Sequence, residues 1–142
     1  MSRILSIDYG SKRVGLALSD PTGSLASPLP FIPATPFAKL YGTIKALVRE
    51  KEIDLILVGL PRNMDGTYGP SARAAEEFAR RLREVVVIPI RMVDERLSTV
   101  EASKKLREGG RDARQQKAKI DSASAQVLLQ TYLDTPEREL LG

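Results

Sequence analysis

Runs of apolar residues predict five strands along the chain. The first two cover Arg3–Asp8 and Arg13–Ser19, and the short turn between them requires antiparallel pairing. A proline-rich stretch, Leu25–Pro33, favours a third strand at an edge of the sheet. The continuous apolar run Asp54–Val58 is typical of a strand buried on both faces of a parallel sheet. A fifth strand is predicted over Val85–Val93, whose mostly apolar composition favours a central position.

Apolar residues at helical spacing predict the helices that accompany these strands. The expected helices run from Pro36 to about Lys51, from about Ser71 to Arg83, from Ser98 to the pair Gly109-Gly110, and from Ile120 to Leu133. A capping box formed by Ser98 and Glu101 marks the start of the third one. The order of elements predicts an α/β fold, a mixed five-stranded sheet with helices packed on it.

The length and composition indicate one domain over residues 1–142. A chain of 142 residues, 42% of them hydrophobic, is long enough to bury a core without a disulfide or a structural metal. Residues 135–142 are expected to form a frayed tail. The start of the chain lacks the apolar segment of a signal peptide, and the apolar stretches are far shorter than the roughly 18 residues that a membrane span needs. We therefore expect a cytoplasmic protein that does not enter a membrane.

The sequence contains neither cysteine nor histidine, which excludes several classes of chemistry. Thiolate nucleophiles, zinc–thiolate sites and iron–sulfur clusters need Cys, and Ser-His-Asp or Cys-His hydrolysis needs His. Carboxylates, Lys, Arg, Tyr and hydroxyl groups remain for catalysis. Carboxylates prefer hard cations such as Mg²⁺ or Mn²⁺.

Three carboxylates lie where such a cation site could form. Asp8 ends a buried strand, Glu95 follows the fifth strand, and Asp121 begins the last helix on the stripe of Ala125, Leu128 and Tyr132. Each has a structural alternative: an Asx-type cap of the hairpin, a solvated charge before a helix, and an N-terminal helix cap, respectively. Together they predict a divalent-cation site, because a sheet carrying that helix on its face can bring all three side chains together.

Basic residues gather between the second and third of these carboxylates. Eight basic residues and three acidic ones lie between Arg96 and Lys119, a surplus of five that exceeds the net charge of +4 for the whole chain. A mobile clamp on phosphates is expected over the loop Gly109–Lys119. The alternative is an ordinary solvated helix face. None of the four Tyr and three Phe residues lies among these basic residues, which favours backbone or shape recognition over base stacking.

Four motifs resemble the YqgF/RuvX family of small ribonuclease H-like proteins, which are described both as pre-16S rRNA nucleases and as Holliday junction resolvases. The matching stretches are Ile7-Asp8-Tyr9-Gly10 with Arg13-Val14-Gly15-Leu16-Ala17, Val58-Gly59-Leu60-Pro61 with Asn63-Met64-Asp65-Gly66, Asp94-Glu95-Arg96-Leu97-Ser98-Thr99, and Asp121-Ser122-Ala123-Ser124-Ala125. They occur in the expected order, and the resemblance extends from about Arg3 to Asp134. It implies a ribonuclease H-like fold and assigns the acidic triad of the family to Asp8, Glu95 and Asp121.

The resemblance further implies phosphodiester hydrolysis assisted by two Mg²⁺ or Mn²⁺ ions, with Asp8 as the candidate bridging ligand. We expect processing of the 5′ end of pre-16S rRNA in ribosome biogenesis, with resolution of branched DNA in recombination or repair as the alternative. The expected contacts to nucleic acid are Arg62, Asn63, Arg96, Lys104, Lys105, Arg111, Arg114, Lys117 and Lys119. Arg62 and Asn63 also suit a tight turn, and Arg96 could instead neutralise Asp94.

Two rival functions remain open at this stage. A non-catalytic RNA-binding module of the same fold would bind nucleic acid without cleaving it. The motif Asp8-Tyr9-Gly10 also occurs in actin-like phosphotransfer enzymes, but these close a nucleotide between two domains, and 142 residues supply only one. The chain is expected to be a monomer or a homodimer, the latter being what a symmetric four-way junction requires.

Overall fold

The five strands form one mixed sheet, as the hydrophobic pattern predicted. A computed structural model of the chain describes residues 3–61, 68–94 and 113–134, with side chains in the last range from Ser122 onward. The strands are β1 (Arg3–Tyr9), β2 (Arg13–Ser19), β3 (Ala26–Pro33), β4 (Ile53–Leu60) and β5 (Ile90–Asp94), in the spatial order β3-β2-β1-β4-β5. β2 is antiparallel to both β1 and β3, whereas β1, β4 and β5 are parallel.

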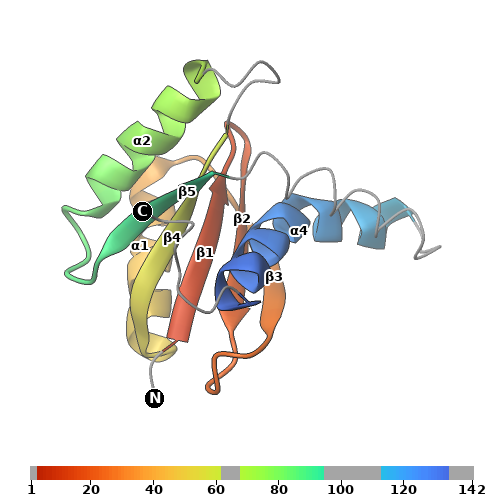
Figure 1. The fold of residues 1–142 in the computed structure, drawn as a ribbon. Coiled ribbons are helices and arrows are strands. Elements are labelled where there is room, and N and C mark those ends of the chain that lie inside the picture. Colours follow the sequence, from red (N-terminus) through yellow and green to blue (C-terminus); the bar gives the residue numbers. More distant parts are fainter. Residues whose placement is uncertain (1–2, 62–67, 95–112, 135–142) are drawn as a thin grey trace.

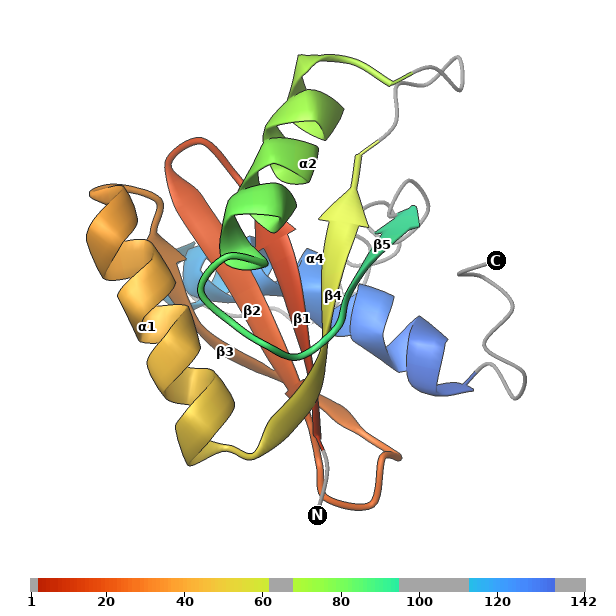
Figure 2. The same cartoon turned by 90° about the vertical axis from the view of Figure 1, so that its left-hand side faces the viewer.

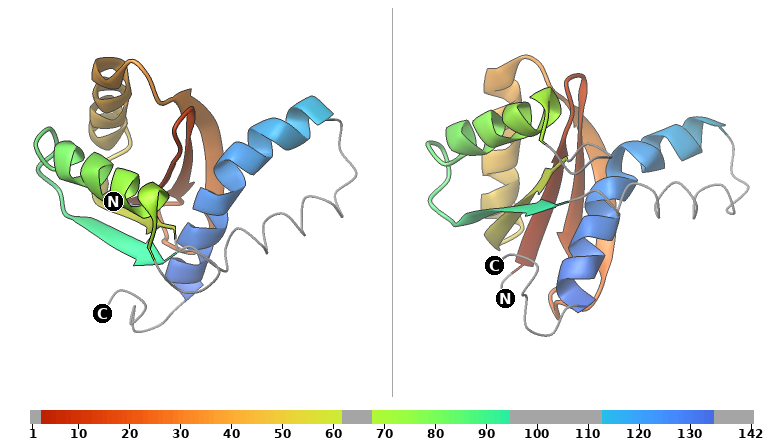
Figure 3. Two further views of the ribbon diagram at one scale, coloured as in Figure 1. Left: turned by 90° about the horizontal axis from the view of Figure 1, so that it is seen from above. Right: turned by 45° about the horizontal axis from the view of Figure 1, so that its top comes forward.

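Helices cover both faces of this sheet. The helices α1 (Phe37–Glu50) and α2 (Pro70–Leu82) pack on one face, and α4 (Ala113–Asp134) crosses the other (Figure 1). Figure 2, in which α1 and α2 lie in front of the strands, and the view from above in Figure 3 show these three layers. The prolines at the first two helix starts suit positions where no backbone N–H donor is needed.

The two faces carry separate hydrophobic clusters. On the α1/α2 face, helix residues such as Leu40 and Phe78 are buried against Leu5, Ile7 and other strand residues. The cluster on the α4 face joins four residues of α4 to four residues of the sheet: Ala125, Leu128, Leu129 and Tyr132 with Ala17, Ala26, Leu57 and Val93. Strand alternation therefore sends successive residues of β1, β2 and β4 into different layers.

The fifth strand differs from the prediction in both extent and position. It begins at Ile90 instead of Val85, and it lies at an edge of the sheet, not at its centre. The valines before it form the turn that leaves α2, where Val86 packs into the core and Val87 is fully exposed. An apolar run can thus form the connection after a helix instead of pairing in the sheet, which composition alone does not reveal.

The last helix begins earlier than predicted. It starts at Ala113 instead of Ile120, so Arg114, Lys117 and Lys119 belong to a helix and not to a loop. Residues 113–119 consist of Ala, Arg, Gln and Lys, which are strong helix formers. The prediction placed this segment in a loop because it is rich in basic residues. The predicted third helix and the expected tail over 135–142 fall outside the described residues. None of the helices in the described ranges is long and apolar enough to cross a membrane.

Candidate active site

Asp8 lies near the carboxyl end of β1, on the face that α4 covers. Its neighbour on that face is Ser6, two residues earlier, whose hydroxyl donates a hydrogen bond of 2.7 Å to the backbone oxygen of Ala125 in α4. The Asp8 side chain is half-buried. Because β1, β4 and β5 are parallel, their carboxyl ends meet at one edge of the sheet, which is where ligands gather in sheets of this kind.

Glycines flank Asp8 on both neighbouring strands. Gly15 on β2 is its register partner, and Gly59 on β4 follows Val58, the partner of Ile7. Alternation from Ala17 and Leu57, which both contact the α4 layer, places these glycines on the Asp8 face. Neither glycine carries a side chain, so on both strands next to Asp8 only the backbone faces this side of the sheet.

Ser122 links α4 to the sheet by hydrogen bonds, one of them at Leu16, which is paired with the residue before Asp8. Its hydroxyl accepts a hydrogen bond of 3.3 Å from the Leu16 backbone nitrogen and donates one of 2.6 Å to the Leu29 backbone oxygen. These two backbone groups flank an irregularity in the β2–β3 pairing, and Leu16 lies opposite Ile7 on β1. The hydroxyl thus bridges the strands where their ladder is irregular.

The position of Asp121 follows from this anchor. It immediately precedes Ser122 and lies one turn before Ala125, whose burial with Leu128 and Tyr132 confirms the predicted apolar stripe. Because α4 begins at Ala113, Asp121 lies within the helix, and the alternative of an N-terminal cap is wrong. The side chain of Asp121 is not among those described.

Most of the other predicted site residues fall outside the described ranges. These are Glu95, Arg62, Asn63, Arg96, Lys104, Lys105 and Arg111, while Arg114, Lys117 and Lys119 are placed on α4 by their backbone alone. Glu95 is the residue after Asp94, where β5 ends. Among the described side chains, no three acidic residues gather into a metal-binding group. The acidic triad therefore stays a prediction, of which the structure describes the first side chain and the backbone position of the third.

A basic and an aromatic residue near Asp8 were missed by the sequence analysis. The guanidinium carbon of Arg13 lies 5.3 Å from the ring centre of Phe31, within the range of a cation–π contact. The sequence contains a signal for Arg13: it lies two residues before Gly15 in a predicted strand, so strand alternation places both residues on one face. Only the pairing of β2 with β3 brings Phe31 to it.

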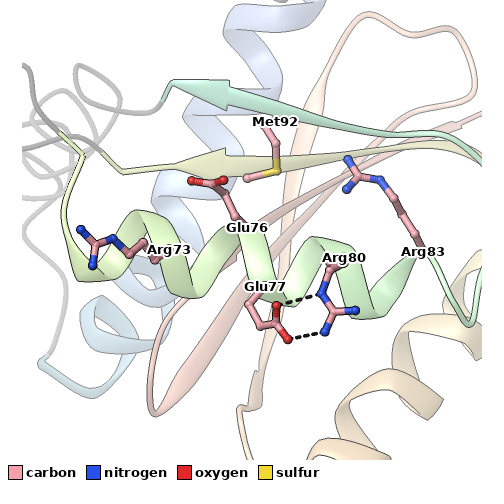
Figure 4. A pocket seen from close by; sticks show the side chains of 6 residues that line it. All are labelled: Arg73, Glu76, Glu77, Arg80, Arg83 and Met92. Carbon is pink, nitrogen blue, oxygen red and sulfur yellow. Dashed lines mark hydrogen bonds and ion pairs between the residues drawn. The ribbon is translucent and has the colours of Figure 1, made fainter.

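A charged cleft of about 420 Å³ lies between α2 and β5, on the face of the sheet away from Asp8 (Figure 4). Glu77 accepts hydrogen bonds from Arg80 and Arg81, which lower the pKa of its carboxyl group to about 2. These pairs are exposed and three or four residues apart on one helix, as in ordinary helix-surface networks. This cleft therefore has no part in the site around Asp8.

Comparison with solved structures defines the class of fold. The chain aligns with RuvC from Thermus thermophilus with a TM-score of 0.59, 12% identity and 97% of each chain covered. It also aligns with a Fowlpox virus resolvase, solved in complex with Holliday junction DNA, with a TM-score of 0.57, 10% identity, and 94% of this chain and 97% of that chain covered. The described architecture is thus a ribonuclease H-like fold, as the motifs implied.

Comparison of sequences identifies the family. The family model described as "RuvX: Holliday junction resolvase" matches residues 2–135, so the chain belongs to the RuvX family, confirming the resemblance seen in the motifs. A relative from Roseiflexus sp. is 41% identical over 94% of each chain, and one from Moorella thermoacetica is 42% identical over 93% of this chain and 94% of its own. Both relatives carry the name "Putative pre-16S rRNA nuclease".

Proposed function

We propose that this protein is a metal-dependent nuclease that hydrolyses phosphodiester bonds in structured nucleic acid and processes the 5′ end of pre-16S rRNA. Membership of the RuvX family and the names of its relatives support the class of reaction. The observation that carries the proposal is the half-buried Asp8 carboxylate, placed between two glycines at the carboxyl edge of the sheet. The anchor at Ser122 holds the backbone of Asp121 close to the same edge.

The donor set suits a hard divalent cation. A carboxylate beside two glycines, in a chain without Cys or His, supplies the oxygen ligands that Mg²⁺ and Mn²⁺ prefer. Asp8, Glu95 and Asp121 would hold the metal, with Val93 on the α4 face supporting the same face for Glu95 if the strand alternation continues. Bound there, two such ions would supply an activated water and stabilise the leaving oxygen.

The remaining residues of the site bind and orient the substrate. Arg114, Lys117 and Lys119 lie on the part of α4 that precedes Asp121, so α4 would bring phosphate contacts and an acidic ligand to one place. Such contacts neutralise phosphates without reading sequence. The cytoplasmic location and the choice between monomer and homodimer stay predictions.

Cleavage of branched DNA is the second candidate function. The family description names a Holliday junction resolvase, and Thermus thermophilus RuvC, whose fold is similar, was solved with a Holliday junction substrate. The names of the sequence relatives favour precursor RNA. A four-way junction, being symmetric, would require two copies of the site.

Replacement of Asp8 by Asn tests the proposed chemistry. We expect Asp8→Asn to abolish cleavage of a 5′-extended 16S precursor RNA in Mg²⁺ or Mn²⁺, because the neutral amide is a much weaker cation ligand. Asp54→Asn is the matched control: Asp54 is exposed near the start of β4, at the opposite end of the sheet. Cleavage rates are measured on both variants and on the wild type, with and without metal.

The same assay separates the candidate functions. A four-way DNA junction replaces the RNA in a parallel series, and preferred cleavage of the junction would favour the resolvase function. Full metal-dependent cleavage by a folded Asp8→Asn variant would disprove the proposed site. Tight binding by the wild type with no cleavage of either substrate in either metal would instead indicate the non-catalytic module.

A further inference from the structure

Arg13 and Phe31 form a pair on the same face of the sheet as Asp8. Val14 and Ile32, their respective chain neighbours, are register partners buried in the cluster under α1 and α2. Alternation therefore sends both Arg13 and Phe31 to the α4 face, and their separation of 5.3 Å agrees with this placement. Both residues are only half-buried.

This pair lies directly beyond the position of Asp8. Gly15 is opposite Asp8, and Arg13 lies two residues before Gly15 in β2, on the same face. At about 3.3 Å per residue, the backbone of Arg13 is about 7 Å along the strand from the level of Asp8. A guanidinium group on its long side chain can reach a phosphate that neighbours one placed at the carboxylate.

The backbone around Arg13 is held by close contacts. A Cβ atom on Gly10 would lie 2.6 Å from the Arg13 backbone oxygen, so the hairpin closes more tightly than any other residue type would allow. The Ala34 backbone nitrogen donates a hydrogen bond of 2.9 Å to the Lys12 backbone oxygen, and Arg13 is the register partner of Pro33. The base of the Arg13 side chain is thereby fixed relative to Asp8.

We infer that Arg13, oriented by the Phe31 ring, binds a backbone phosphate of the nucleic acid next to the phosphate that is cleaved. A guanidinium in cation–π contact with a ring can also donate two hydrogen bonds to phosphate oxygens through the N–H groups in its plane. The ring restricts the side chain before the substrate arrives, which reduces the entropy lost on binding. The inference rests on the proposed function, because it assumes a nucleic-acid substrate at Asp8.

This contact differs from the phosphate clamp predicted over residues 109–119. It comes from the β1–β2 hairpin and β3 instead of α4, and it pairs a basic residue with an aromatic one. Such a contact would fix the register of the nucleic-acid strand relative to the acidic residues, whereas the basic residues of α4 would mainly raise affinity.

Binding without metal provides the test, since no cleavage then occurs. The probe is a fluorescent 5′-extended 16S precursor RNA in a buffer containing a chelator, titrated at several salt concentrations. We expect Arg13→Gln to weaken binding about tenfold, as for a lost charge-assisted hydrogen bond, and to reduce the slope of log K against log salt by about 0.7–0.9. The matched control is Arg49→Gln, an equal loss of charge on the exposed face of α1, which should leave affinity and slope unchanged.

Two further variants separate orientation from charge. Arg13→Lys retains the charge and should restore the slope but only part of the affinity, because an ammonium group cannot bind bidentately. Phe31→Leu should weaken binding several-fold with the slope unchanged, since it removes only the restraint on Arg13. Thermal melting checks that each variant folds. If the Phe31→Leu variant does not fold, the Arg13→Gln and Arg13→Lys variants still test the inference.

The outcomes distinguish the inference from the function on which it rests. If the wild type binds and cleaves the RNA, and the Arg13→Gln variant binds it as tightly as the Arg49→Gln variant does, only the inference about Arg13 is overturned. Failure of the wild type to bind either the RNA or a four-way DNA junction would overturn both.

Discussion

At the scale of single residues, Gly10 and Gly42 differ in the space that a side chain would have at each position. A Cβ on Gly10 would meet the Arg13 backbone oxygen at 2.6 Å, whereas a Cβ on Gly42, in the exposed middle of α1, would meet no atom within 4 Å beyond its chain neighbours and the backbone of its own helix. Glycine is thus required in the hairpin beside the candidate site. In the helix it only adds flexibility to the unfolded chain and weakens the helical preference.

Alanine substitutions at these two glycines should change stability in opposite directions. Gly10→Ala is expected to lower the free energy of unfolding by about 1–3 kcal/mol, the usual cost of overpacking, because a backbone atom must move. Gly42→Ala should raise it by about 0.5–1 kcal/mol. Urea denaturation measures both. A Gly10→Ala variant as stable as the wild type would show that the hairpin, and with it Arg13, is not held in place by this approach.

The position of Asp8 near the end of an apolar strand was predictable from the sequence, and β1 has it there. Its role as a metal ligand stays a prediction. The Arg13–Phe31 pair could not be found in this way, because it depends on a bulged register between β2 and β3. Alternation gives the face of each residue but not its partner on the next strand.

At the scale of elements, two serines contribute hydrogen bonds to the docking of α4 on the sheet. Ser122 satisfies a backbone donor and a backbone acceptor on two strands, while Ser6 donates to the Ala125 oxygen in the helix. The Ala125 oxygen also belongs to the helical hydrogen-bond ladder, so it keeps a partner if Ser6 is lost. Leu16 and Leu29 would each lose the bond to the hydroxyl if Ser122 were replaced.

Replacing these serines should therefore have unequal costs. Ser122→Ala is expected to destabilise the fold by about 1–3 kcal/mol, because it removes the hydrogen-bond partner of two backbone groups at a buried site. Ser6→Ala should cost only about 0.5–1.5 kcal/mol. Chemical denaturation of both variants provides the comparison. Equal losses would mean that the bulge finds other partners, for instance water, and that Ser122 is not the anchor of α4.

Elements were predictable where hydrophobic periodicity matched burial, as in β1, β2, α1 and α2. The sequence misplaced the boundaries where amphipathic signals were weak. Residues 113–119 contain no large apolar side chain, so the first turns of α4 left no periodic signal. The valines before β5 are apolar, which predicted a strand, but they form the connection between α2 and β5 and do not pair in the sheet.

At the scale of the whole molecule, the sheet separates the layer of α1 and α2 from the layer of α4, and two of the three predicted carboxylates belong to the α4 side. Asp8 shares the α4 face with Ser6, which donates a hydrogen bond to the Ala125 oxygen, and Asp121 belongs to α4 itself. Order of elements and binary patterning sufficed to predict an α/β sheet. Assigning Asp8, Gly15 and Gly59 to one face of the sheet required the pairing of β1 with β2 and β4.

This separation predicts that core substitutions of equal size will differ in their effect on activity. Leu40 in α1 and Leu128 in α4 are both almost fully buried, at 0% and 2% exposed, so truncation of either to Ala should cost about 2–5 kcal/mol of stability. Leu128→Ala should also reduce the cleavage rate well below the melting transition, because a cavity under α4 loosens the helix that carries Asp121. Leu40→Ala should leave that rate nearly unchanged, since its cavity opens in the other layer. Melting curves and single-turnover cleavage on the same samples test this, and equal losses of activity would show that catalysis follows overall stability and not the position of α4.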